Sequence, residues 1–241
     1  MMKKAVAYFF LLAQLIPGTV FAGDYKMVLG KGIEVCEAYL KNLNSFPKAP
    51  PMVCERPLNP ELKDFQKPEW KALDVGENFA LLKEILRYSY KEKGGDFEAY
   101  YNKVLPTLKN NITDRQIKLS VTQLDVDLDG KLENVLRHEI DTCDPANESL
   151  FATPGGREFF VLNEEKTKID VQKTKKIHLG GRLDIFLYKG QISIDGWGGN
   201  LGFKDGVIYV YTIEPYATPP SWHTVHRCDY NYAPSKSQRK S

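Results

Sequence analysis

The sequence predicts an α+β protein in which a helical N-terminal region is followed by a mainly antiparallel β region. Before about residue 112, apolar side chains recur at helical spacing; from residue 113 onward they alternate with polar ones, as in half-buried strands. The connections between the later strands are too short for the crossovers that parallel pairing needs. The composition, 42% apolar and 27% charged, is that of a globular protein, which excludes disordered and collagen-like chains.

Residues 1–22 have the pattern of a secretory signal peptide. Lys3 and Lys4 precede an apolar run from Ala5 to Ile16, and the segment ends at the small residue Ala22. A membrane anchor needs roughly 20 apolar residues, and this run is shorter. We therefore expect cleavage near Ala22 and a periplasmic or secreted protein without a transmembrane anchor.

Charge in the mature chain is balanced. Removal of 22 residues with two lysines and no acid from a chain of 241 leaves 219 residues, with 31 basic and 31 acidic side chains. Proteins that bind nucleic acids usually carry a strongly basic patch or domain. The balance therefore argues against a nucleic-acid partner.

Residues 23–112 are predicted to be helical and rich in loops. The spacing of apolar residues predicts helices around 33–43, 79–86 and 97–108, the third kinked or ended near Pro106. Five prolines between Phe46 and Pro60 exclude regular structure there.

Residues 113–234 are predicted to form seven or eight short antiparallel strands, arranged as a sandwich or a partly closed barrel. Ile117, Leu119 and Val121 alternate with polar residues, and Lys189-Gly190 has the composition of a turn between two strands. Residues 235–241 are expected to form a basic, flexible tail.

Four cysteines lie in the mature chain, and an even number in an oxidising compartment predicts two disulfides. Three pairings are possible. We favour Cys36 with Cys54 and Cys143 with Cys228, because one pair then falls in each region. Cys36 is expected to face inward on its helix. A zinc site is the alternative, but the chain has no Cys-x-x-Cys spacing.

Residues 125–133 have the composition of a loop that binds a hard cation. Gly130 permits a sharp turn, and alternate acids can point inward in such a loop, which suits Ca²⁺. An EF-hand is excluded for two reasons. An EF-hand loop has a bidentate Glu at position 12, where this chain has Leu136, and the segments that flank the loop are predicted strands rather than helices. The alternative is an acidic surface turn whose Asp and Gly suit tight backbone geometry. The candidate ligands are the carboxylates of Asp125, Asp127, Asp129 and Glu133 and the backbone carbonyl of Lys131.

This segment resembles the Asp-x-Asp-x-Asp-Gly-x-x-Asp calcium loop of the FG-GAP and VCBS families, over residues 117–140. The resemblance implies that the four acids hold Ca²⁺ between two strands, with Glu133 in place of the usual Asp. Seven or eight strands are too few for a closed propeller, so the resemblance covers the loop alone. Such an ion would be structural rather than catalytic.

Two aromatic segments are candidate contact surfaces for a protein or an envelope glycan. Trp197 lies in a glycine-rich stretch, and Tyr216 and Trp222 bound a stretch rich in proline. Exposed aromatics are favoured anchors in interfaces. The alternative, which we favour, is that Trp197 and Trp222 close the ends of the β core.

With its predicted signal peptide, four cysteines and acidic loop, the chain resembles exported proteins of the Gram-negative periplasm. The function expected is a non-enzymatic binding or inhibitor protein, a class that includes immunity proteins against envelope-directed toxins. No nucleophile motif of a known hydrolase occurs in the chain. The alternatives are a calcium-dependent hydrolase of the cell envelope and a structural or adhesive module.

Overall fold

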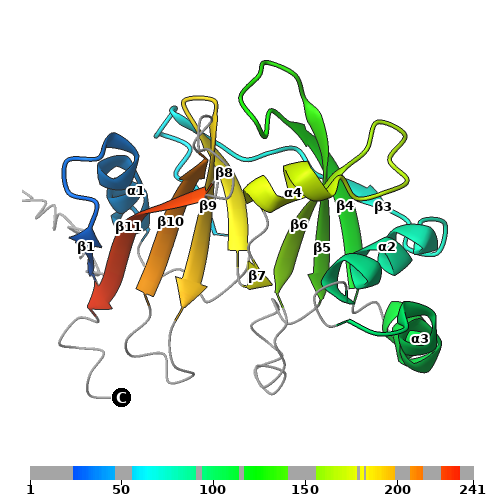
Figure 1. Cartoon of the computed structure of the whole chain (residues 1–241). Coiled ribbons are helices and arrows are strands. Elements are labelled where there is room, and N and C mark those ends of the chain that lie inside the picture. The colour runs from blue at the N-terminus through cyan, green and yellow to red at the C-terminus, as the bar shows by residue number, and fades with distance from the viewer. Residues whose placement is uncertain are drawn as a thin grey trace, which may run out of the picture.

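The computed structural model contains two antiparallel β-sheets that lie side by side, with α1 at one end of the molecule and α2 and α3 at the other (Figure 1). This confirms the predicted α+β class. The structure describes residues 24–46, 56–90, 94–113, 117–140, 156–177, 180–181, 183–198, 207–213 and 224–233.

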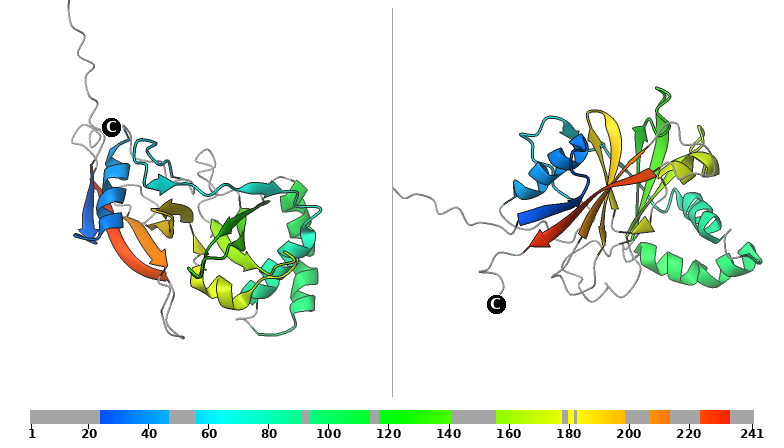
Figure 2. Two further views of the ribbon diagram at one scale, coloured as in Figure 1. Left: turned by 90° about the horizontal axis from the view of Figure 1, so that it is seen from above. Right: turned by 60° about the vertical axis from the view of Figure 1, so that its left-hand side comes forward.

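The six-stranded sheet has the order β1-β11-β10-β9-β8-β2, and it joins both ends of the described chain (Figure 2). β8 and β9 form a hairpin in which Tyr188 pairs with Gln191. Lys189 and Gly190 have φ values of 51° and 80°, as a two-residue hairpin turn requires, so the predicted turn is confirmed. The strands are β1 (Asp24–Leu29), β2 (Phe65–Gln66), β8 (Leu183–Tyr188), β9 (Gln191–Gly198), β10 (Val207–Ile213) and β11 (Thr224–Ala233).

Helix α1 (Glu34–Asn44) covers one face of this sheet. Tyr39 is completely buried and stacks on Phe186 of β8, with ring centroids 5.0 Å apart. Two aromatic rings in this arrangement contribute attraction beyond the apolar area that they bury. The side-chain amide of Asn44 accepts a hydrogen bond from the backbone N–H of Tyr25 and donates one to its carbonyl, at 2.7 and 3.1 Å. α1 is therefore fixed both to the sheet face and to the edge strand.

A disulfide joins Cys36 of α1 to Cys228 of β11. The preferred pairing of Cys36 with Cys54 and of Cys143 with Cys228 is therefore wrong, because each of those pairs contains one of these two residues. The preference assumed separate regions, whereas β1 pairs with β11 and so brings the first and last described strands together. Cys54 and Cys143 lie outside the described residues. The prediction that Cys36 faces inward is confirmed, because its side chain is completely buried.

The five-stranded sheet has the order β3-β4-β5-β6-β7, and α2 packs on its outer face. Leu82 of α2 contacts a cluster that includes Leu136 and Phe160. α3 continues past Pro106, so the predicted helix does not end there. The elements are β3 (Lys71–Leu73), β4 (Ile117–Leu124), β5 (Glu133–Ile140), β6 (Arg157–Leu162), β7 (Gly180–Gly181), α2 (Phe79–Tyr90), α3 (Phe97–Thr113) and α4 (Val171–Ile177).

A shared apolar core joins the two sheets. Phe159 and Val161 of β6 pack in one cluster with Ile185 of β8 and Ile194 of β9, and all four side chains are completely buried. The sequence boundary near residue 112 is crossed by both sheets, because β1, β2 and β3 precede it. The N-terminal region is thus helical only in part. The described part of the later region contains eight strands, β4 to β11, which agrees with the predicted seven or eight.

The predicted signal peptide (1–22) and basic tail (235–241) lie outside the described residues. Within the part of the chain that the structure describes, no helix combines the length and the apolar character that crossing a bilayer demands.

Candidate functional site

The acidic loop connects β4 to β5, whose last register pair before the loop is Leu124 with Glu133. Leu128 and Gly130 have φ values of 58° and 88°, and the tight path fits the glycine, which adopts such values without strain. The carboxylate of Asp125 accepts hydrogen bonds from the backbone N–H groups of Asp129 and Gly130, both at 3.0 Å. Asp125 therefore closes the loop onto itself.

Three of the predicted ligands converge. Oxygens of Asp125, Asp127 and Glu133 all lie within 4.8 Å of one another. Asp129 is outside this group, and its Oδ1 accepts the backbone N–H of Lys131 at 2.8 Å. The acidic triad (Asp125, Asp127 and Glu133) could hold a metal ion, since carboxylate oxygens are the donors that hard cations prefer.

The triad faces two lysines of α4 that the sequence analysis did not connect with it. The Nζ atom of Lys173 lies 2.6 Å from Glu133 Oε1 and 3.4 Å from Asp127 Oδ2. The Nζ atom of Lys176 lies 3.3 Å from the same Asp127 oxygen. Their i, i+3 spacing places both on one helix face, but spacing alone does not reveal which acids that face meets.

The two lysines favour the charged form of Asp127. Burial raises the pKa of Asp127, but the neighbouring Lys176 and Lys173 outweigh it and hold that pKa below its usual range. The hydrogen bond to Glu133 raises the pKa of Lys173. Asp127 and Lys173 are therefore both held in their charged forms at neutral pH.

Among the described residues, one carboxylate oxygen of the triad lacks a hydrogen-bond partner. Glu133 Oε2 accepts the backbone N–H of Val126 at 2.8 Å, and Asp127 Oδ2 faces the lysines. Asp127 Oδ1 is buried and has no hydrogen-bond partner among the described residues. An unsatisfied buried carboxylate oxygen is unfavourable, and a cation in the loop would satisfy it. The residues present therefore fit a hard cation.

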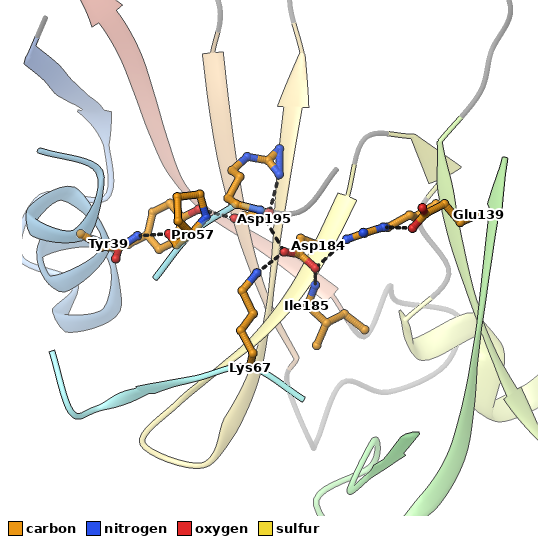
Figure 3. Close-up of polar contacts among 10 residues, drawn as sticks. Tyr39, Pro57, Lys67, Glu139, Asp184, Ile185 and Asp195 are labelled. Atoms are coloured by element: carbon orange, nitrogen blue, oxygen red, sulfur yellow. Dashed lines mark hydrogen bonds and ion pairs between the residues drawn. The ribbon is translucent and has the colours of Figure 1, made fainter. Parts of the chain in front are cut away.

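A second charged centre lies deep between α1 and the two sheets (Figure 3). Asp184 of β8 and Asp195 of β9 are register partners and are 2% and 1% exposed. Arg56 Nη1 donates to Asp195 Oδ1 at 2.7 Å, and the Arg56 backbone N–H donates to Asp184 Oδ2 at 3.2 Å. The Tyr39 hydroxyl also donates to Asp195. Burial, followed by the charge of Asp195, raises the pKa of Tyr39 well above its ordinary value, so the phenol stays protonated.

Arg157 of β6 extends this centre into the five-stranded sheet. It donates to Asp184 Oδ1 at 3.0 Å and to Glu139 Oε2 of β5 at 2.6 Å, and Figure 3 shows Asp184 between Lys67 and this pair. Burial raises the pKa of Asp184, although Lys67 and Arg157 oppose the shift. The centre is a set of ion pairs that ties segment 56–67 and both sheets together. We call it the buried charge centre, consisting of Tyr39, Arg56, Lys67, Glu139, Arg157, Asp184 and Asp195.

Of the predicted aromatic contact residues, Trp197 alone lies within the described part of the chain. Trp197 lies on β9, where it is the register partner of Ile208 on β10. Tyr216 and Trp222 lie outside the described residues, so both interpretations of these segments stay predictions.

Comparison of the chain with protein-family models, curated protein sequences and solved structures finds no match.

Proposed function

We propose that this protein is an exported, non-catalytic binding or inhibitor protein whose β4–β5 loop holds Ca²⁺. The observation that carries the proposal is the convergence of three carboxylates within 4.8 Å. Asp125, Asp127 and Glu133 would supply side-chain oxygens to the ion. When bound, the ion would offset two of the three negative charges of the triad and fix the hairpin.

Calcium is favoured over other cations by the donor set and by the compartment. All candidate ligands are oxygens, which suit Ca²⁺ and Mg²⁺ rather than zinc or copper, and the acids recur in the order of the calcium loops described above. Exported calcium modules bind with dissociation constants of about 10⁻⁴ to 10⁻³ M, which ambient calcium satisfies.

The non-catalytic part of the proposal is supported by the buried charge centre. Asp184 and Asp195 are almost inaccessible, and each is paired with a cationic side chain. A general acid or base must reach its substrate within hydrogen-bond distance, and these carboxylates are occupied inside the fold. The partner would then be a protein, such as an envelope-directed toxin, or an envelope glycan.

Calorimetry of the mature protein (residues 23–241) with Ca²⁺ tests the metal. We expect binding in the range of about 10⁻⁴ to 10⁻³ M for the wild type and none for Asp127→Ala. Glu164→Ala is the matched control, because Glu164 is an exposed acid outside the loop, and it should bind as the wild type does. The absence of heat in the wild type would remove the site.

The non-catalytic part is tested separately with purified envelope glycan. The mature protein, with Ca²⁺ present, is expected to release no soluble fragments. Turnover of that substrate at substoichiometric protein would instead establish the alternative, a calcium-dependent hydrolase.

A further inference from the structure

We propose that Lys173 and Lys176 of α4 are built-in competitors of the metal ion and set the affinity of the acidic loop. This inference rests on the proposed function, because it assigns regulation of the same site. It follows from which oxygens of the triad the lysines already contact.

The lysines contact the oxygens that a metal would need next. Asp127 Oδ1 has no hydrogen-bond partner among the described residues, so it is available to an incoming cation. Asp125 can supply a second oxygen, but the oxygens beyond these two lie beside the lysines. Glu133 Oε1 is 2.6 Å from Lys173 Nζ, and Asp127 Oδ2 is 3.4 and 3.3 Å from the two ammonium groups. Positive charges at such separations repel strongly in a partly buried site. Metal binding and these ion pairs therefore oppose each other.

The charges of the triad explain why the lysines are present. Three carboxylates within 4.8 Å repel one another, and Glu133 is only 8% exposed. Lys173 and Lys176 offset most of that repulsion when no metal is bound. The hairpin can then fold before it meets calcium, and the loop binds the ion weakly rather than depending on it.

The helix that carries the lysines is held independently of them. Thr174 Oγ1 accepts the backbone N–H of Val161 at 2.9 Å, and the Lys176 carbonyl accepts the hydroxyl of Thr224 at 3.0 Å. Thr174 and Ile177 are completely or almost completely buried. The lysine side chains, 33% and 22% exposed, can therefore turn toward solvent while α4 stays in place.

Calcium calorimetry of lysine variants at constant ionic strength tests the proposal. Lys173→Gln/Lys176→Gln should bind Ca²⁺ about a hundred-fold more tightly than the wild type, or about ten-fold for each charge removed from the partly buried site. Lys173→Arg/Lys176→Arg keeps both charges and should stay within about three-fold of the wild type. Lys175→Gln, an exposed lysine of the same helix, should leave the affinity unchanged.

A second measurement separates competition from a merely structural role. In a chelator, the double glutamine variant should melt at a lower temperature than the wild type, and Ca²⁺ should restore more of that loss than it adds to the wild type. If the double variant does not fold, Lys176→Gln alone keeps the contact between Lys173 and Glu133 and should still gain about ten-fold in affinity.

The outcomes distinguish this inference from the proposed function. Equal calcium affinity in the wild type and the double glutamine variant would overturn the inference and leave the calcium site standing. Binding by the variant alone would support the inference and overturn calcium binding by the native protein. The absence of binding in every form would overturn both.

Discussion

The buried charge centre and the acidic loop are built from the same kinds of side chain, yet they differ in balance and in burial. In the centre, Glu139, Asp184 and Asp195 face Arg56, Arg157 and Lys67, and their contacts join both sheets. In the loop, three carboxylates face two lysines, and one buried oxygen has no described partner. A balanced, enclosed set of charges fixes a fold, whereas an excess of carboxylate near solvent leaves capacity for a ligand.

Breaking the centre should have the largest effect. Arg157→Met removes the guanidinium that Glu139 and Asp184 share, and the loss of these two buried ion pairs is expected to lower the free energy of unfolding by about 3–5 kcal/mol. Urea denaturation measures the change. Lys118→Met is the matched control: Lys118 also faces Glu139, at 3.7 Å, but is 58% exposed, so less than about 1 kcal/mol is expected. Equal losses in the two variants would contradict the role of burial.

Breaking the loop in the same way should have a smaller effect. Glu133→Gln removes the charge that holds Lys173 but keeps an acceptor for the backbone N–H of Val126. Lys173 can turn to water, so we expect a loss of about 1–2 kcal/mol in a chelator. Denaturation with and without Ca²⁺ measures the loss and should show that the variant no longer responds to the ion. A loss as large as that of Arg157→Met would remove the contrast.

Acid should affect the two centres with opposite sign. Burial raises the pKa of Asp127, but the lysines lower it further, to below the ordinary 3.8. Its stabilising effect is therefore present above 3.8 and is lost as the pH falls through the lowered value. Burial raises the pKa of Asp184 above 3.8 despite Lys67 and Arg157. As the pH falls, Asp184 therefore takes up a proton in the folded chain before it does so in the unfolded chain. This protonation relieves the penalty for burying the Asp184 charge as the pH falls toward 3.8.

Carboxyl-detected NMR titration checks these directions residue by residue. The Asp127 signal should titrate below 3.8 and that of Asp184 above it. In addition, Asp127→Asn should have a lower free energy of unfolding than the wild type at neutral pH. This difference should disappear below the lowered pKa of Asp127. The reverse order of the two carboxyls would show that the lysines do not govern the loop.

The smallest effect is expected at Asp129, which lies outside the triad and bonds the backbone N–H of Lys131. Asp129→Asn should change calcium affinity by less than about three-fold, whereas Asp125→Asn removes a charge from the triad and should weaken binding about ten-fold or more. Calorimetry distinguishes the two. A similar weakening in both would mean that Asp129 joins the ion, as the loop resemblance implies.

Local patterns predicted α1, α2, α3 and several later strands, because each of these depends on neighbouring residues, but they did not predict β1, β2, β3 or α4. The alternation from Ile117 onward gave β4, and Lys189-Gly190 gave the turn between β8 and β9. The pairing of β1 with β11 was not predictable, because no local pattern specifies a partner so distant in the chain. The disulfide was misassigned for the same reason.

The candidate site shows the same limit. The order of acids in residues 125–133 identified the loop, and three of the four predicted carboxylates converge. The lysines of α4 were missed because the position of their helix beside the loop depends on tertiary packing, including that of α4 against β6. The buried charge centre was also missed. The local sequence does not distinguish Asp184 and Asp195 from exposed polar residues, and only the pairing of β8 with β9 brings them together.

The bond between Cys36 and Cys228 also dictates when the fold can be completed. Its partners are 192 positions apart, and such a closure restricts the unfolded chain enough to contribute about 5 kcal/mol. During synthesis, residues 24–29 emerge early but have no strand to pair with until β11 follows, so the start of the chain must wait for its end. A chain truncated before residue 224 would thus lack both the neighbour of β1 and the thiol that secures α1.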